Sequence, residues 1–272
     1  MAQFRDQLNR LVEFSPPPRR IVSLVPSQTE LLYRLGLDEA VAGITKFCEH
    51  PHEWFRKKVK IGGTKNLDIS KIRALNPDLI IAGKEENIKE QVEELAEQFA
   101  VWVSDVSTYQ QALEMIEGVG AVTGRAAVAS QLTQTIEANF ADLNSLVHTP
   151  GMEPTPSPRI AYLIWKDPYM AAGGDTFIGD MLRIAGFENI FENSSRYPTV
   201  NVETLRESNC ELLFLSSEPY PFSQKHILSF SEQLPGTRVM LVDGMPFSWY
   251  GSRLEQAPAY FTELHRQVSL NN

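Results

Sequence analysis

The segment RIVSLVPSQTELLYRLG, residues 20–36, sets the predicted fold because it joins an apolar strand directly to a helix. Residues 21–25 are apolar at almost every position instead of alternating with polar residues, which is typical of a strand buried on both faces of a parallel sheet. Residues 28–35 form the predicted helix, and Gly36 marks its end. A strand that runs into a helix in this way indicates an α/β fold.

The same order of elements occurs a second time along the chain. A strand at 160–164 is followed by a helix at 176–185 that ends before Gly186. Each half then adds two more strands, at 79–82 and 101–105 in the first half and at 212–216 and 239–243 in the second. We therefore predict two Rossmann-like lobes with parallel sheets, and a cleft between two such lobes is the usual place for a ligand.

A helical block lies between the two predicted lobes. Its main helix, residues 125–146, has an apolar stripe at intervals of three and four residues, formed by Val128, Leu132, Ile136, Phe140 and Leu143. At the α-helical rise this helix would span roughly 33 Å and join the lobes as a single long backbone helix. The predicted domains are residues 1–109, 110–147 and 148–272, with an irregular Pro-rich stretch at 149–158. One stiff connection of this kind is expected to restrict lobe closure to a small hinge motion.

Composition limits the classes of partner. Of the 272 residues, 43% are hydrophobic and 22% charged, and the net charge of −9 disfavours binding to nucleic acid or to an anionic membrane. No stretch approaches the ~18 apolar residues of a membrane span, and residues 1–8 lack the apolar core of a signal peptide. We expect a monomer that either stays in the cytoplasm or has lost an export signal. Cys48 and Cys210, one in each lobe, are expected to be thiols.

Five segments in a fixed order resemble one family of binding proteins. They are DQLNRLV (residues 6–12), RIVSLVPSQTELL (20–32), LNPDLIIA (75–82), GFENIF (186–191) and WYGSR (249–253). Together they resemble the helical-backbone (class III) periplasmic substrate-binding proteins of ABC importers for cobalamin, haem and ferric siderophores, particularly the cobalamin-binding members. The resemblance covers residues 6–268. It implies a large metal chelate as ligand, an ABC permease as partner, a periplasmic or cell-surface location, and neither catalysis nor an intrinsic cofactor.

The resemblance directs the search for ligand residues to the loops after each strand, because ligands of such sheets bind at the strand carboxyl ends. Flat aromatic rings suit a corrin or porphyrin, and Lys or Arg side chains suit carboxamides, propionates or phosphate. The candidate ligand residues are Pro26, Lys46, Phe47, Thr64, Trp165, Tyr169, Arg196, Tyr197, Trp249, Tyr250 and Arg253.

The resemblance also aligns individual positions. Phe47, Tyr169 and Tyr197 fall where the cobalamin-binding relative has ring-stacking aromatics. Thr64 and Gly83 stand at two further positions where that relative has such rings. These two departures bear on which chelate is bound.

Several candidates have a plain structural alternative. Trp165 is expected either in the core of its lobe or at the ligand. Of Trp249 and Tyr250, one is expected to pack and the other to contact the ligand. Arg253 would cap the last helix if it does not reach the ligand.

The family docks onto its importer through one acidic residue in each lobe. Glu203 occupies that position in the second lobe, whereas in the first lobe the matching position is Ser70 and the nearest acid is Asp68. Asp68 and Ser70 are also good helix N-caps, and Glu203 suits the first turn of any helix. Both interpretations are open at this point.

The segment CEHPH, residues 48–52, is the one cluster of metal-ligand residue types in the sequence. Its Cys48 and His50 would suit zinc, or the axial position of a haem iron or cobalt. The alternative is an ordinary polar loop.

The predicted function is the capture of a large metal chelate, with a corrinoid favoured, for delivery to an ABC importer. Haem or a ferric siderophore is the alternative ligand, and a cytoplasmic carrier or sensor is the alternative role. An enzyme is disfavoured because neither a phosphate-binding glycine loop nor a nucleophile elbow occurs. A chelatase using Glu49, His50 and His52 is the enzymatic alternative.

Overall fold

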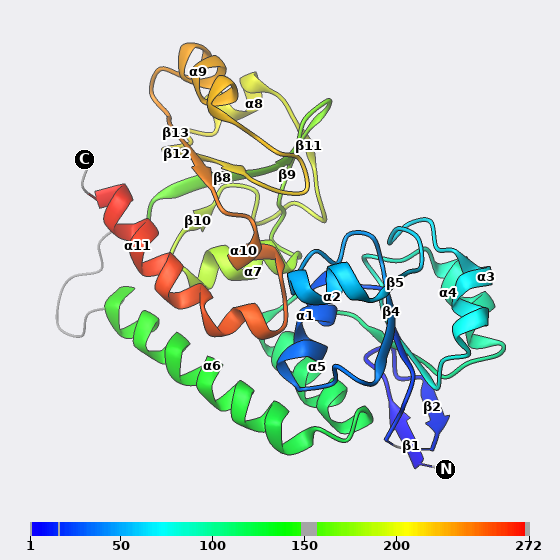
Figure 1. The fold of residues 1–272 in the computed structure, drawn as a ribbon. Helices are drawn as coiled ribbons and strands as arrows, with labels where there is room; N and C mark the ends of the chain where they lie inside the picture. The colour runs from blue at the N-terminus through cyan, green and yellow to red at the C-terminus, as the bar shows by residue number, and fades with distance from the viewer. Residues whose placement is uncertain (1, 16, 148–156, 270–272) are drawn as a thin grey trace. The chain divides into compact units, whose positions relative to one another are not determined.

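The computed structural model describes residues 2–15, 17–147 and 157–269, and the chain divides into two compact units (Figure 1). Unit 1 comprises Met1–Val106, Gln110–Thr135 and Tyr250–Ser252, and unit 2 comprises Ser107–Tyr109, Ile136–Trp249 and Arg253–Asn272. Both units contain parallel strands with helices between them, which confirms the predicted fold class.

Unit 1 is built on a five-stranded parallel sheet in the order β5-β4-β3-β6-β7. Its central strands β3 and β6 are buried at every position, as their unbroken apolar runs predicted. The strands are β3 (Ile21–Ser23), β4 (Val41–Ile44), β5 (Val59–Lys60), β6 (Leu79–Gly83) and β7 (Val101–Ser104).

The helices of unit 1 connect these strands. Helix α1 (Pro26–Arg34) begins at a proline, which the first turn tolerates because its N–H has no intrahelical partner there. Gly36 follows its end in the left-handed conformation (φ 74°), as predicted. The other helices are α2 (His52–Lys57), α3 (Ile69–Leu75), α4 (Lys89–Ala96) and α5 (Tyr109–Val122), whose first residue belongs to unit 2.

A hairpin of β1 (Ala2–Arg5) and β2 (Leu11–Phe14) precedes the sheet and was not predicted. The Asp6 carboxylate closes its turn by accepting from the backbone N–H groups of Leu8 (3.0 Å) and Arg10 (2.8 Å). Each strand has only four residues, too few for a clear alternating pattern.

Unit 2 has a six-stranded sheet in the order β11-β9-β8-β12-β13, with β10 paired to β8. Strands β8, β10, β12 and β13 are parallel, and β12 covers the residues predicted for it. The strands are β8 (Arg159–Trp165), β9 (Tyr169–Ala171), β10 (Glu188–Asn189), β11 (Thr199–Val200), β12 (Leu212–Ser216) and β13 (Arg238–Val242).

This second sheet is mixed rather than wholly parallel. Strand β9 runs antiparallel to both β8 and β11. The three residues between β8 and β9 allow only an antiparallel return, because a parallel partner needs a crossover of a dozen or more residues.

Helix α6 (Ala126–Val147) begins one residue later and ends one residue later than predicted. Its residues 126–135 belong to unit 1, and the rest of the helix belongs to unit 2. The remaining elements of unit 2 are α7 (Phe177–Ile184), α8 (Val202–Glu207), α9 (Gln224–Gln233), α10 (Met245–Ser248), the 3-10 helix η1 (Ser252–Glu255, shared with unit 1) and α11 (Ala257–Ser269). In the described part of the chain, no helix combines the length and apolarity needed to cross a bilayer.

Candidate functional site

In unit 1, the loops that follow β4 and β5 meet at the carboxyl edge of the sheet. The backbone N–H of Lys46 donates to the carbonyl of Gly62 (2.8 Å). The Phe47 ring lies against Gly63, where an added Cβ would be only 3.1 Å from it. The Lys46 ammonium lies 5.1 Å from the centroid of the Phe47 ring, within cation–π range. Because Phe47 is 51% exposed, unit 1 presents an aromatic ring beside a cation to solvent.

Asn87 ties three loops of this edge together, and sequence reasoning missed it. Its side-chain oxygen accepts from the N–H of Gly83 (2.9 Å), and its amide group donates to the carbonyls of Leu24 (3.3 Å) and Thr64 (3.1 Å). Asn87 is buried, so these bonds hold the ends of β3 and β6 beside the segment that contains Thr64. The signal in the sequence was only an asparagine just before a helix.

Gly83 and Tyr250 pack closely against each other in unit 1. A Cβ on Gly83 would lie 3.3 Å from the Tyr250 hydroxyl oxygen and 3.1 Å from a methyl group of Val25. Tyr250 itself is only 6% exposed. Of the adjacent pair Trp249 and Tyr250, Tyr250 is therefore the residue that packs, and Pro26 at the start of α1 is half-buried at the same edge.

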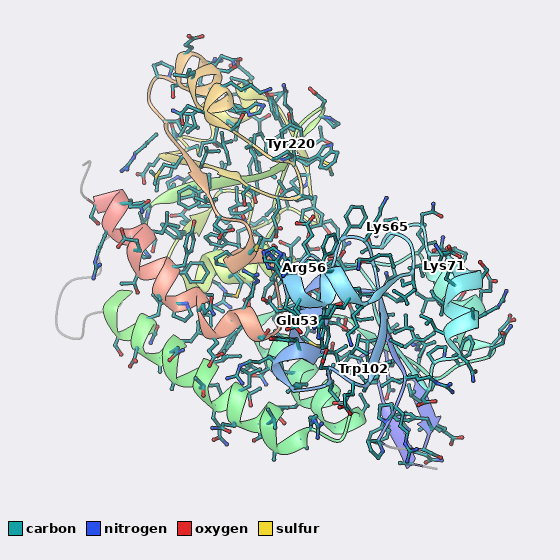
Figure 2. The ribbon with its side chains drawn as sticks, viewed as in Figure 1. Glu53, Arg56, Lys65, Lys71, Trp102 and Tyr220 are labelled. Atoms are coloured by element: carbon teal, nitrogen blue, oxygen red, sulfur yellow. The ribbon has the colours of Figure 1, made fainter. Side chains whose placement is uncertain are left out.

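In unit 2, an aromatic group lies at the carboxyl ends of β8 and β12. Trp165, at the end of β8, is 40% exposed and meets the Tyr220 ring edge-on at 5.8 Å. The core alternative for Trp165 thus does not hold, whereas its neighbour Tyr162 is fully buried and donates to Ser216 (3.0 Å). Figure 2 labels Tyr220, which sequence reasoning did not select.

His226 positions the Tyr220 hydroxyl group. The backbone N–H of Ser223 donates to His226 Nδ1 (2.9 Å), so the neutral imidazole carries its proton on Nε2. That nitrogen lies 3.4 Å from the Tyr220 oxygen, which therefore accepts and keeps its own hydrogen to donate. Burial, together with Lys225 and Lys166, lowers the pKa of His226 and favours this neutral form.

Trp249 and Arg253 form a second cation–aromatic pair in unit 2. The Arg253 guanidinium lies 4.7 Å from the centroid of the Trp249 ring. Glu218 contacts this pair: it accepts hydrogen bonds from the Ser248 hydroxyl (2.7 Å) and from the Trp249 indole. Burial raises the pKa of Glu218. Sequence reasoning missed Glu218, although an acid just after the apolar run 212–216 was a usable signal.

The other candidates of unit 2 are held differently. Tyr169 is half-buried and its ring packs on Phe230 at 5.0 Å, within the apolar core. Arg196 has a left-handed backbone (φ 58°), and its N–H donates to the Asp175 carboxylate. Its guanidinium lies 5.8 Å from the centroid of the half-buried Tyr197 ring.

The structure does not support a metal role for Cys48. Its thiol is fully buried, 3.1 Å from each of the hydroxyls of Thr29 and Thr45, and burial raises its pKa, which disfavours the thiolate that binds metals. His50 and His52 have ring centroids 4.9 Å apart. Among residues 2–15, 17–147 and 157–269, no three His, Cys, Asp or Glu side chains are placed to hold a metal ion.

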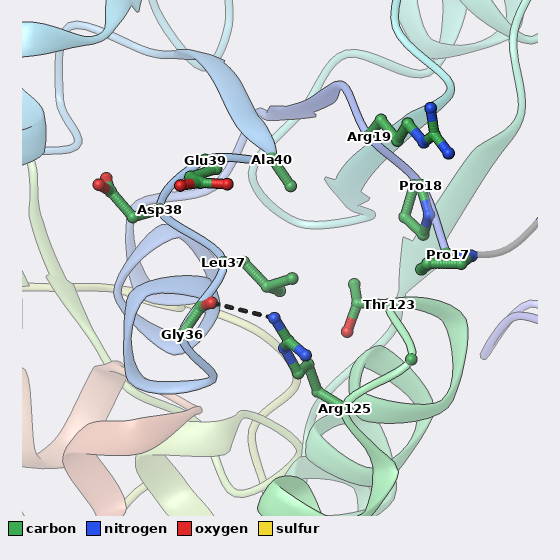
Figure 3. Close-up of a pocket in the computed structure, with 11 residues that line it drawn as sticks. Pro17, Pro18, Arg19, Gly36, Leu37, Asp38, Glu39, Ala40, Thr123 and Arg125 are labelled. Carbon is green, nitrogen blue, oxygen red and sulfur yellow. Dashed lines mark hydrogen bonds between the residues drawn. The ribbon is translucent and has the colours of Figure 1, made fainter.

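A pocket of about 970 Å³ lies on unit 1 at the opposite edge of the sheet, where β3 and β4 begin. Arg125 crosses it and donates to the carbonyl of Gly36 (3.3 Å; Figure 3). None of the candidate ligand residues lines it. The lining residues are Pro17, Pro18, Arg19, Gly36, Leu37, Asp38, Glu39, Ala40, Thr123, Gly124 and Arg125.

Comparison with known proteins identifies the family. A model described as "Periplasmic binding protein" matches residues 21–233. The chain belongs to this periplasmic binding protein family. The uncharacterized ABC transporter substrate-binding lipoprotein YvrC of Bacillus subtilis is 27% identical over 208 residues, which span 75% of this chain and 65% of that protein.

A vitamin B12-binding protein of Vibrio vulnificus is 24% identical over 202 residues, which span 74% of this chain and 72% of that protein. Among solved structures, the molybdate periplasmic binding protein MolA of Haemophilus influenzae has a TM-score of 0.81 at 16% identity, covering 100% of this chain and 92% of that one. The structural likeness shows a shared fold. Periplasmic binding proteins capture substrates and do not transform them, so the chain is not an enzyme and the chelatase alternative is set aside.

The predicted docking residues of this periplasmic binding protein have local partners. Asp68 is the N-cap of α3: it accepts from the N–H of Lys71 (3.1 Å) and from the Ser70 hydroxyl (2.7 Å). These bonds lower its pKa to about 2. Figure 2 labels Lys71, whose ammonium lies 3.0 Å from the same carboxylate. Glu203 is exposed in the first turn of α8 and pairs with Arg206.

Proposed function

We propose that this chain is the substrate-binding component of an ABC importer and that its ligand is a corrinoid. We further propose a periplasmic or cell-surface location, with the chelate carried as cargo rather than held as a cofactor. The vitamin B12-binding relative and the lipoprotein relative support this assignment.

One observation carries the choice of ligand class. Each unit places an aromatic ring beside a cation at the carboxyl edge of its sheet: the exposed Phe47 with Lys46 in unit 1, and the half-buried Trp249 with Arg253 in unit 2. The exposed part of each ring stays in water unless a ligand covers it. A planar chelate with polar arms would cover the rings and meet the cations.

Other ligands account for less of this arrangement. A small oxyanion such as molybdate would use the cations and backbone N–H groups but would leave the rings exposed. Haem and ferric siderophores share the flat or apolar surface and the acidic arms, so they are the alternative ligands within the same class.

The partner surface is proposed in the same way. Glu203 is exposed and its pairing with Arg206 is a surface contact of small energy, so it can exchange Arg206 for a basic residue of a permease. Asp68 and Ser70 are bonded to each other at the start of α3. In unit 1, the docking role therefore competes with helix capping.

The test is a titration of the full chain with cyanocobalamin, dicyanocobinamide, haemin, a ferric siderophore and molybdate, followed by tryptophan quenching. We expect saturable binding of the corrinoids. Phe47→Ala and Trp249→Ala should each weaken binding by about 1–3 kcal/mol. Tyr33→Ala is the matched control, because Tyr33 is a 44% exposed aromatic at the end of α1, away from the carboxyl edge.

Three results separate the alternatives. Loss of affinity in both single variants supports the proposal, because each ring then contributes to corrinoid binding. Tight binding of haemin or a siderophore alone reassigns the chelate within the class. Unchanged corrinoid affinity in the double variant, or binding of molybdate alone, refutes the proposal.

A further inference from the structure

Glu218 is a half-buried acid that the proposed function has not yet used. It follows β12 directly and lies against the turn before α10, where Gly244 leaves room for it: a Cβ on Gly244 would be 2.6 Å from Glu218 Cγ. The Ser248 hydroxyl donates to Glu218 Oε1 (2.7 Å), and the Trp249 indole N–H donates to the same carboxyl group. Two consecutive residues therefore direct their donors at one half-buried acceptor.

The bond from the indole N–H restrains the Trp249 ring, while the bond from Ser248 holds the Glu218 carboxyl group that accepts it. The indole N–H is the only polar atom of a tryptophan side chain, so a hydrogen bond to it holds the ring against rotation. Arg253 lies over that ring at 4.7 Å and is also attracted by the Glu218 charge. The carboxylate thus acts on Arg253 both through the ring and through its charge.

We propose that Glu218 is a positioning residue that holds Trp249 and Arg253 as a polar anchor for an acceptor group of the ligand, such as a carboxamide, carboxylate or phosphate. This inference rests on the proposed function and extends it. It makes binding depend on pH, because a protonated Glu218 loses its charge and one of its acceptor positions.

The groups around Glu218 define the direction of that dependence. Burial and the nearby Asp243 raise the pKa of Glu218, and the bonds from Ser248 and Trp249 and the charge of Arg253 oppose the rise without cancelling it. Two phenols near Glu218 and Asp243 stay neutral: burial raises the pKa of Tyr162, on β8, well above its usual range, and that of Tyr260, on α11 beside Asp243, to about 12. Ligand affinity should therefore fall as the pH drops through a value above the ordinary glutamate range.

The experiment follows the Trp249 indole proton directly by ¹H–¹⁵N NMR of the full chain between pH 4.5 and 8, with the signal assigned by Trp249→Phe. We expect this signal to titrate with an apparent pKa above 4.5. Glu218→Gln should abolish the titration. Ser248→Ala should move it to higher pH, since Ser248 stabilises the carboxylate. Glu207→Gln is the matched control, because Glu207 is an exposed glutamate at the end of α8.

The second measurement is cyanocobalamin affinity at pH 7.5 and 4.5. Glu218→Gln should weaken binding about tenfold at pH 7.5 and remove the difference between the two pH values; Glu207→Gln should do neither. An indole signal that does not titrate, and that Glu218→Gln leaves unshifted, overturns the positioning role whether or not any ligand binds. If the signal titrates but the wild type binds no chelate, the proposed function fails while the positioning of Trp249 stands.

Discussion

Phe247→Ala tests how the core of unit 2 supports the Trp249 anchor. Phe247 is fully buried and is the only buried residue of α10. Its ring contacts Phe261 at 4.8 Å and Tyr162 at 5.1 Å between centroids. These two rings belong to α11 and β8, so they are held by elements that the substitution leaves intact.

The expected cost follows from this packing. Removal of a fully buried phenyl ring costs about 3–5 kcal/mol, with the larger values at sites that cannot collapse into the cavity. Rigid neighbours on two elements place Phe247 in the upper part of that range. With a urea dependence of about 2 kcal/mol per molar, the midpoint of unfolding should fall by about 2 M.

The assay is urea unfolding monitored by far-UV circular dichroism. Leu228→Ala is the control: Leu228 is 60% exposed on α9, and its loss should change the free energy of unfolding by less than about 0.5 kcal/mol. Cyanocobalamin affinity, measured at urea concentrations below the transition, should also fall with Phe247→Ala. Trp249 lies only two residues after Phe247, so loss of the buried ring should disturb its position. A destabilisation under about 1 kcal/mol would refute the argument, since it would mean that the site closes over the cavity.

Three further predictions concern single side chains. Burial lowers the pKa of His226 below 6.5, so below about pH 6.5 the unfolded chain binds more protons than the folded chain. The free energy of unfolding should therefore fall on acidification in this range. His226→Gln should remove this contribution to the pH dependence, as measured by urea titrations at several pH values. Cys48 should resist a thiol reagent until urea unfolds the chain, and zinc should leave the Tm unchanged; rapid native labelling would contradict its burial. Gly83→Ala should lower the Tm, and Tyr250→Phe should recover part of the loss by removing the hydroxyl 3.3 Å from the new Cβ; additive effects of the two changes would count against the contact.

The central strands could be predicted because burial on both faces requires an unbroken run of apolar or small residues, which is visible in the sequence. In β6 and β12 every side chain is buried, so each position had to be apolar or small. The two-residue strands β5, β10 and β11 are too short to show such a run. They exist because neighbouring strands offer them hydrogen-bond partners, which local sequence does not record.

The candidate site could be predicted in part for a similar reason. Phe47 and Trp249 are rings in loops after strands, and both the residue type and its place are visible in the sequence. Asn87 and Glu218 were missed because their partners are distant: Asn87 joins Leu24 to Thr64, and Glu218 meets residues 30 positions later. Such contacts follow from the strand order of the folded sheet.

The glycine at position 83 connects the fold to the choice of ligand. The resemblance to cobalamin-binding proteins led us to expect a ring-stacking aromatic at this position, but here the Tyr250 hydroxyl, Ser104 and Val25 fill the space to within 3.3 Å of any Cβ. A larger residue at 83 would have to displace Tyr250, which is buried against the same edge. Within the described residues of this edge, Phe47 is then the exposed ring, with Lys46 beside it. A ligand that stacks on one ring and reaches a cation in unit 1 needs less flat area there than one that stacks on several. The close contact between Gly83 and Tyr250 therefore predicts that ring stacking in unit 1 depends on Phe47 rather than on position 83.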